Sequence, residues 1–352
     1  MSYTNSEKYQ QEIAEQYSKR AAKFPKEKVA EALGKLGFEI AAVDLKEART
    51  GNVNATHVAS KIVVKVSKDR DEVNYLANKV ISERLSDYEP VVKVLAYDYF
   101  EKTDFEVLVM ERARGTLLLD DIFNLSKEDL VKLFRQVLRV VKAMFTITFV
   151  DFGHVNNQHE HFKTYSEFLS DGFNKHIEVI REQKLCREED VSRVEEYFLK
   201  HVHVFDGEKA VFVHTDLHMG NILHEGNKLS AILDFDYSLR APKVAVLESL
   251  LGFIDNPQQF VEGTDDFPNY QGKKFLFLLP ILHEELKEAF SDPLLIRKLN
   301  LIYIGSGIMW IADNWSAEWN KEMMQNIITQ EVPDEVGDVR NSYYGMIISL
   351  VA

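Results

Sequence analysis

The spacing of apolar residues changes from a helical to a strand period within the first 110 residues. Apolar side chains recur every three or four positions over 9–24 and 29–36, which predicts two helices ending at Pro25 and Gly37. The next apolar runs are short and rich in β-branched residues, and they predict strands over 38–49, 54–59, 61–66, 91–99 and 106–110. One further helix is predicted over 71–85. The pattern therefore predicts five strands around one helix, beginning with an antiparallel meander.

Beyond residue 116 the period is mainly helical. Broad apolar faces predict helices over about 130–141, 165–183 and 188–203, and two short apolar runs at 210–213 and 230–233 predict strands. The change of period predicts an α+β chain with a β-rich lobe, a connection and a helical lobe, over residues 1–110, 111–115 and 116–352.

Composition describes an ordinary folded chain with an acidic surface. The 352 residues are 45% hydrophobic and 28% charged, which excludes a disordered chain, and the single cysteine excludes an intramolecular disulfide. The N-terminal residues hold no signal-like apolar segment, so we expect a cytoplasmic protein. A net charge of -14 argues against nucleic acid and anionic membranes as partners; it either keeps the protein soluble or attracts a cationic ligand.

One constellation of polar residues follows the two short strands. The segment His214-Thr215-Asp216-Leu217-His218-Met219-Gly220-Asn221 is followed by Asp234-Phe235-Asp236, a spacing close to the catalytic loop and metal motif of kinases. Phosphoryl transfer needs a carboxylate that accepts the proton of the attacking hydroxyl, and oxygen ligands for Mg²⁺ on the nucleotide phosphates. We assign the first task to Asp216 and the second to Asn221 and Asp234.

A second candidate group lies in the predicted strand 61–66. Lys65 stands between apolar residues, where a buried charge needs a partner, unless the strand is an edge and Lys65 faces water. A strand lysine that holds phosphates and is oriented by a helix glutamate is part of a kinase site. Glu72 is the preferred partner; Glu83, three helical turns further on, is the alternative.

At these residues the chain resembles the aminoglycoside phosphotransferase and choline kinase-like family, from about residue 32 to 250. The resemblance implies a two-lobed protein-kinase-like fold, with an antiparallel sheet in the N-terminal lobe. It implies a nucleotide loop containing Gly51, Asn52 and Asn54, and a hinge in which backbone groups of Glu111 and Ala113 meet the nucleotide base.

The same resemblance implies a function. We expect an ATP- and Mg²⁺-dependent enzyme, with GTP as an open alternative, that phosphorylates a hydroxyl of a small molecule. An aminoglycoside-type antibiotic, a cation, is the favoured acceptor; choline-like amino alcohols, macrolides and sugars are alternatives. A nucleotide-binding regulatory protein without catalysis is an alternative of another class. The oligomeric state stays open.

Two departures from the protein-kinase pattern, and one from the pattern of the family itself, bear on this expectation. Gly51 stands alone where protein kinases have a glycine-rich loop, and no A-P-E motif follows Asp234 at the spacing of an activation loop. Protein substrates are therefore not expected. The acidic residue that family members place after the metal motif is not at its usual spacing, and Glu248 is the candidate substitute.

Overall fold

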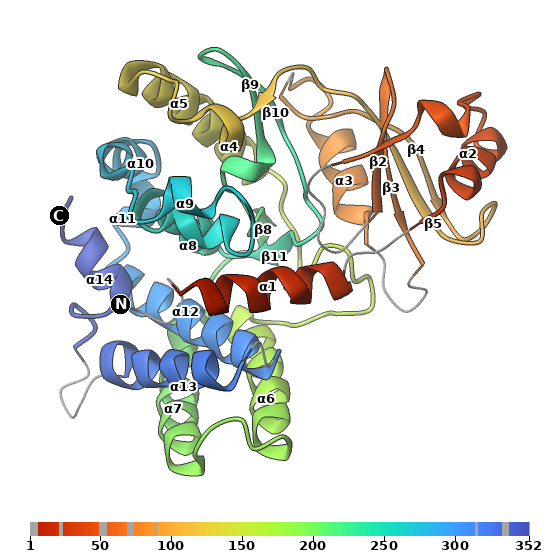
Figure 1. Ribbon diagram of the computed structural model, residues 1–352. Coiled ribbons are helices and arrows are strands. Elements are labelled where there is room, and N and C mark those ends of the chain that lie inside the picture. Colours follow the sequence, from red (N-terminus) through yellow and green to blue (C-terminus); the bar gives the residue numbers. More distant parts are fainter. Residues whose placement is uncertain are drawn as a thin grey trace.

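The computed structural model describes residues 6–20, 24–48, 55–68, 74–88, 90–313, 316–332 and 338–351; the side chains of 16–20 are not described. The chain forms two lobes, a sheet-containing lobe on the right of Figure 1 and a larger helical lobe on the left. The expected fold class is confirmed, with an antiparallel sheet in the N-terminal lobe and a mainly helical C-terminal lobe.

The N-terminal lobe is built on one antiparallel sheet with the strand order β1-β2-β3-β5-β4. Its strands are β1 (Lys46–Glu47), β2 (Ala55–Val58), β3 (Ile62–Ser67), β4 (Val94–Tyr99) and β5 (Glu106–Glu111). The predicted number of strands and the opening meander are confirmed. The first strand is much shorter than predicted, because Lys46 pairs with Val58, the last residue of β2, and earlier residues have no β2 partner.

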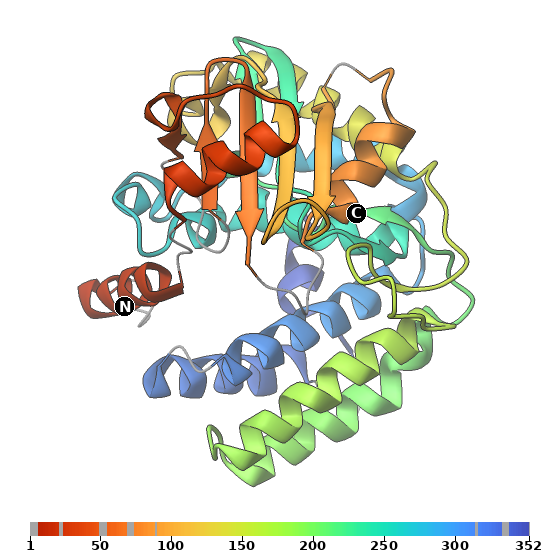
Figure 2. The same ribbon diagram turned by 90° about the vertical axis from the view of Figure 1, so that its right-hand side faces the viewer.

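The alternation of side chains along β3 and β5 gives the sheet two different faces. Val64 and Val66 point to the face covered by α2 (Lys26–Lys35), where they pack with Val29 and Leu33. Figure 2 shows α2 lying across that face. The other face, toward α3 (Leu76–Arg84), carries Lys65, because side chains two residues apart share a face and Val63 packs there. The period of the strand thus turns Lys65 toward the helical lobe.

The helical lobe is entered through a hinge after β5. Its main helices are α4 (Leu118–Asp121), α5 (Lys127–Met144), α6 (Tyr165–Glu182), α7 (Glu188–His201), α8 (Val246–Asp255), α9 (Phe267–Tyr270), α10 (Leu279–Glu285), α11 (Lys287–Phe290), α12 (Leu295–Ala312), α13 (Ala317–Asn326) and α14 (Tyr343–Ile348). The three long helices predicted between residues 130 and 203 are confirmed as α5, α6 and α7.

Two small sheets in this lobe carry the polar motifs. One has the order β10-β9-β6 and the other β7-β11-β8. Their strands are β6 (Thr116–Leu117), β7 (Gly153–His154), β8 (Val211–Val213), β9 (Ile222–Glu225), β10 (Lys228–Ile232) and β11 (Leu239–Ala241). The predicted strands at 210–213 and 230–233 correspond to β8 and β10, which lie in different sheets. The hairpin of β9 and β10 brings the residues after β10 back beside those after β8.

Two helices differ from expectation in their surroundings. The helix α12 is long and apolar enough to cross a membrane by length and composition alone, but more than half of it is buried inside the helical lobe. It is therefore a core helix. The helix α1 (Glu7–Arg20), expected in the nucleotide lobe, packs its Tyr9 and Ile13 into the core of the helical lobe and lies across that lobe in Figure 1.

Candidate active site

A buried histidine fixes the start of the turn that follows β8. His214 is fully buried; its Nε2 lies 2.9 Å from the carbonyl oxygen of Leu233, and its Nδ1 accepts a hydrogen bond from the backbone N–H of Asp216 at 3.2 Å. Burial lowers the pKa of His214, so the ring is neutral, with its proton on Nε2. One side chain therefore links the Asp216 turn to the segment that leads into Asp234.

The carboxylate of Asp216 is held by the residue predicted to share the metal site. Asn221 Nδ2 donates to the backbone oxygen of Asp216 at 2.8 Å and to its Oδ2 at 3.1 Å. These bonds use the amide nitrogen, so the amide oxygen is the atom of Asn221 that could hold a metal. The side chain of Asp216 remains 37% exposed. Asp216 is thus held in place and open to a reacting hydroxyl.

Asp234 stands in a strained backbone conformation beside Lys65. Its φ is +61°, a left-handed conformation that is uncommon outside glycine and typical of functional turns. Its Oδ1 accepts from Lys65 Nζ at 2.8 Å, while Asp236 Oδ2 accepts from the same nitrogen at 2.7 Å. The side chain of Asp234 is 38% exposed, whereas that of Asp236 is buried. The turn therefore presents one carboxylate to the cleft and keeps the other inside.

The charges of this group depend on one another. Burial opposes ionisation of Lys65, but the two carboxylates raise its pKa above the ordinary value. Burial raises the pKa of Asp234, but Lys65 outweighs it and holds that pKa below its usual range. Burial and the neighbouring Asp234 raise the pKa of Asp236. A cation between two carboxylates is what makes their close approach tolerable.

Of the two glutamates predicted as partners of Lys65, the structure describes Glu83. Glu72 lies outside the described residues. Glu83 does not contact Lys65: its side chain is 65% exposed and lies 4.0 Å from Lys79 Nζ. The reason is geometric, because Glu83 stands near the end of α3 while Lys65 faces the turn at Asp234. The alternative of an edge strand with Lys65 in water is wrong, since β3 lies between β2 and β5 and buries Lys65.

Two asparagines that the sequence did not single out join α3 to this turn. Asn78 Nδ2 donates to Asp236 Oδ1 at 2.8 Å. Asn156, buried in the loop after β7, accepts from the backbone N–H of Ala77 at 2.7 Å and donates to the backbone oxygens of Asn74 and Asp236, both at 2.6 Å. A single amide therefore satisfies backbone groups from both lobes next to the Lys65 cluster. No sequence pattern marks Asn156, because its partners are brought together only by the fold.

We expect Asn156→Ala to lower the free energy of unfolding by about 2 to 3 kcal/mol, because it leaves buried backbone groups without partners. Asn157→Ala is the matched control: Asn157 is exposed, and its side-chain oxygen accepts from the backbone N–H of His159 within its own loop. Urea denaturation of both variants measures the effect. Equal stabilities for the two variants would show that Asn156 does not join the lobes.

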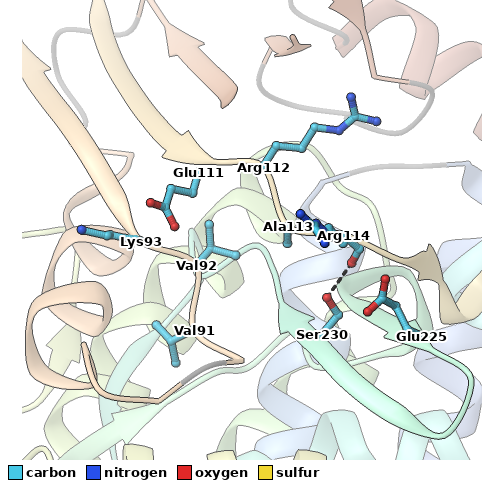
Figure 3. Close-up of a pocket in the computed structure, with 9 residues that line it drawn as sticks. All are labelled: Val91, Val92, Lys93, Glu111, Arg112, Ala113, Arg114, Glu225 and Ser230. Carbon is cyan, nitrogen blue, oxygen red and sulfur yellow. Dashed lines mark hydrogen bonds between the residues drawn. The ribbon is translucent and has the colours of Figure 1, made fainter. Parts of the chain in front are cut away.

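The hinge lies beside an open pocket (Figure 3). Glu111 N–H donates to the backbone oxygen of Lys93 at 2.9 Å, and Ser230 Oγ donates to that of Arg114 at 2.6 Å, so both ends of the hinge are fixed. The cavity of about 260 Å³ has Glu111 and Ala113 in its wall. Gly115 has a φ of +105°, and a Cβ there would lie 2.5 Å from the carbonyl oxygen of His224. Glycine is therefore required where the hinge meets β9.

Of the predicted nucleotide residues, Gly51, Asn52 and Asn54 lie outside the described residues. Asp216, Asn221, Asp234 and Lys65 are brought together by the fold, and Glu111 and Ala113 lie on the hinge. Asn221 and Asp234 offer an amide and a carboxylate oxygen, the hard ligands that Mg²⁺ takes together with substrate phosphates. The described residues contain no group of three or more His, Cys, Asp or Glu side chains that could hold a metal ion by themselves. The donors fit a metal that is held partly by a nucleotide.

Glu248, the candidate substitute for the missing acidic residue, lies in α8. Its Oε1 accepts from Ser306 Oγ in α12 at 2.7 Å, and among the described residues no contact links its side chain to Asp216, Asn221 or Asp234. Burial raises the pKa of the Glu248 carboxyl to about 7. As pH rises from about 4.5, Glu248 therefore ionises in the unfolded chain before it ionises in the folded protein. The free energy of unfolding consequently decreases up to about pH 7.

We expect Glu248→Gln to be more stable than the wild type at pH 8, and equal to it near pH 4. The difference should reach about 1 to 3 kcal/mol, since one pKa unit corresponds to about 1.4 kcal/mol. Urea denaturation at both pH values measures it, with the exposed Glu178→Gln in α6 as the control. A difference that does not change with pH would mean that the fold does not raise the pKa of Glu248.

Comparison with known proteins identifies the class of this fold and then the family. The arrangement is similar to the apo form of a thermostable mutant of aminoglycoside phosphotransferase APH(4)-Ia, with a TM-score of 0.59, 15% identity, and coverage of 84% of this chain and 96% of that chain. It is similar also to the streptomycin–ATP–APH(2")-IIa ternary complex, with a TM-score of 0.57, 14% identity, and coverage of 91% and 99%. These likenesses establish the protein-kinase-like fold of the aminoglycoside phosphotransferases.

The GDP and kanamycin complex of APH(2")-IIia is a further similar structure, with a TM-score of 0.56, 12% identity, and coverage of 85% of this chain and 96% of that chain. No curated protein matches the sequence. Residues 27–244, more than half of the chain, match the model of the phosphotransferase enzyme family. The chain belongs to this family and is a phosphotransferase, which confirms the resemblance found in the sequence.

Proposed function

We propose that the protein transfers the γ-phosphoryl group of a nucleoside triphosphate, with Mg²⁺, to a hydroxyl of an aminoglycoside-type acceptor. The observation that supports this most strongly is the meeting of Asp216, Asn221, Asp234 and Lys65 at one place between the lobes, since strand β3 supplies the lysine and two turns of the helical lobe supply the others. A regulatory protein without catalysis would have no need to keep all four.

Each residue has a role that its surroundings support. Asp216 accepts the proton of the acceptor hydroxyl as its oxygen forms a bond to the γ-phosphorus, while the bond from that phosphorus to the β–γ bridging oxygen breaks. Lys65, which donates to Asp234 and Asp236 in the structure, would direct its ammonium to the nucleotide phosphates. Asn221 and Asp234 would hold Mg²⁺, which supplies positive charge to the phosphates and the leaving oxygen.

The acceptor class has weaker support than the reaction. Each of the similar structures named with a drug contains an aminoglycoside: hygromycin B with APH(4)-Ia, and streptomycin, gentamicin or kanamycin with APH(2") enzymes. The net charge of this chain is -14, which favours a cationic acceptor. However, the acidic residues of the helical lobe include Asp255, Glu284 and Glu285, which are neutralised by ion pairs with Lys274, Arg135 and Lys142.

The test is a screen for phosphorylated products with ATP and with GTP. The acceptors are hygromycin B, streptomycin, gentamicin, kanamycin, choline, a macrolide and glucose, each detected as a mass increase of one phosphate. Transfer to one or more aminoglycosides above the others supports the proposal. Preference for choline or glucose would replace the acceptor class and keep the reaction. Nucleotide binding without transfer to any acceptor would overturn the proposed reaction.

For an aminoglycoside acceptor we expect KM to rise several-fold between 50 and 500 mM salt, because attraction between exposed charges is screened as ionic strength increases. KM for the nucleotide, measured in the same solutions, serves as the reference. The comparison acceptor is glucose, which carries no charge. A KM for the aminoglycoside that is flat in salt would contradict charge attraction as the source of its binding.

A further inference from the structure

The helix α1 contacts the helical lobe at the loop after η6 (Pro257–Val261), in addition to an ion pair between Lys8 and Glu318 of α13 at 2.7 Å. Tyr9 Oη donates to Glu262 Oε2 at 2.8 Å, and the backbone N–H of Gly263 donates to Gln10 Oε1 at 2.6 Å. Gly263 has a φ of +74°, and a Cβ there would lie 2.8 Å from the backbone nitrogen of Ala14. The helix and the loop therefore approach so closely that only glycine fits between them.

The same loop reaches the catalytic turn. It follows the short helix η6 (Pro257–Val261), whose Phe260 stacks on His218 with the ring centroids 4.4 Å apart and the planes at 8°. His218 Nδ1 accepts from the backbone N–H of Gly220 at 3.1 Å, which places the ring proton on Nε2. That nitrogen lies 3.4 Å from Asp216 Oδ1. A continuous chain of contacts thus runs from α1 through Phe260 to the carboxylate of Asp216.

Of this series of contacts, α1 and η6 lie outside the part of the protein that matches the family, while Asp216 lies inside it. The match covers residues 27–244, while α1 precedes it and η6 follows it. Two segments outside the matched region therefore pack on each other and on the catalytic turn. Their contacts are local and specific: one hydroxyl, one amide, one aromatic ring.

We propose that Phe260 is a positioning residue for catalysis and that α1, by fixing the loop after η6, holds Phe260 against His218. The proposal rests on the proposed function of Asp216. Stacking keeps the plane of the His218 ring, so that its Nε2 stays beside both Asp216 Oδ1, at 3.4 Å, and Asn221 Nδ2, at 3.3 Å, and the ring limits the movement of the carboxylate. Without Phe260 the ring turns, and Asp216 spends less time where it meets the acceptor hydroxyl.

Hydrogen exchange tests the contact without any acceptor, so it is independent of the proposed function. Phe260→Ala, and separately the pair Tyr9→Phe with Gln10→Ala, should each raise the exchange of amides 216–222 about tenfold, while amides of α5 stay unchanged and report an intact fold. The control is Phe290→Ala, which removes the ring from another histidine contact, that of His283, with ring centroids 4.9 Å apart. Unchanged exchange at 216–222 in both test variants would overturn the proposal.

Turnover tests the consequence, with whichever of hygromycin B, streptomycin, gentamicin or kanamycin the wild type phosphorylates best. We expect Phe260→Ala to lower kcat about tenfold with KM for the nucleotide within twofold, and Phe260→Tyr to restore kcat, because its ring still stacks. The double variant that carries His218→Ala and Phe260→Ala should have a kcat no lower than that of His218→Ala alone. The positioning role would be refuted if the losses of kcat add fully in the double variant, or if Phe260→Tyr does not recover kcat. If the wild type phosphorylates none of these acceptors, that result counts against the proposed function. Hydrogen exchange of amides 216–222 still tests whether Phe260 and α1 hold the catalytic turn.

Discussion

Replacing Asp216 with asparagine is expected to lower kcat about 100- to 10,000-fold while leaving nucleotide affinity within a few-fold. The substitution keeps the size of the side chain and one oxygen for the amide of Asn221, but it removes the group that accepts the proton. Phosphate transfer to the best acceptor measures kcat, and titration with a nucleotide analogue measures affinity. The two readouts separate loss of chemistry from loss of binding.

The control for this substitution is Asp171→Asn, at an aspartate that lies in α6 and pairs only with Lys175 among the contacts described for it. It should keep the activity of the wild type. Turnover by Asp216→Asn within tenfold of the wild type would remove Asp216 from the role of base and direct attention to another carboxylate in the cleft.

Replacing Asp234 with asparagine is expected to abolish most of the Mg²⁺ dependence of nucleotide binding. The variant loses a negatively charged oxygen at the proposed metal position, and it weakens the ion pair in which Lys65 Nζ lies 2.8 Å from Oδ1. In the wild type we expect Mg²⁺ to tighten nucleotide binding at least tenfold; in the variant the two affinities should agree within about threefold. Calorimetric titration with and without Mg²⁺ gives both values.

Asp265→Asn supplies the comparison, because Asp265 is exposed in the loop before α9. It should show the full Mg²⁺ effect. A variant at Asp234 that still binds nucleotide more tightly with Mg²⁺, by the wild-type factor, would show that the metal is held elsewhere. Asn221→Ala is then the next variant to measure, since its amide oxygen is the second proposed ligand.

The sequence predicts the chemical groups of the site better than the contacts between them. Asp216, Asn221, Asp234 and Lys65 can be found because each follows or occupies a short apolar strand, and such strands are visible in the pattern. The partners of Lys65 were harder to predict. Its described contacts are Asp234 and Asp236, which follow it by 169 and 171 positions, and no local period connects residues so far apart.

The differences in the fold have a similar origin. The predicted strand over 38–49 is reduced to Lys46–Glu47, because pairing depends on how far β2 extends and not on the apolar residues of the segment itself. The position of α1 is another example. Its apolar face correctly predicts a helix, but the same face could pack on the sheet or on the helical lobe. In the structure Tyr9 and Ile13 pack on the helical lobe, and Gly263 permits a close approach between α1 and its loop that no periodicity reveals.

The attachment of α1 also has a consequence for the order in which the chain folds. Tyr9 and Gln10 each bond to a residue 253 positions later, so these contacts cannot form until most of the protein has been synthesised. At roughly 5 to 20 residues per second, α1 waits roughly 13 to 50 s on the ribosome with its apolar face uncovered. The sheet of residues 46–111 can form during that interval from nearer partners. The helix α1 leaves the ribosome long before the loop that it binds, so it reaches its place late, and a chaperone that covers it early would protect the nascent chain.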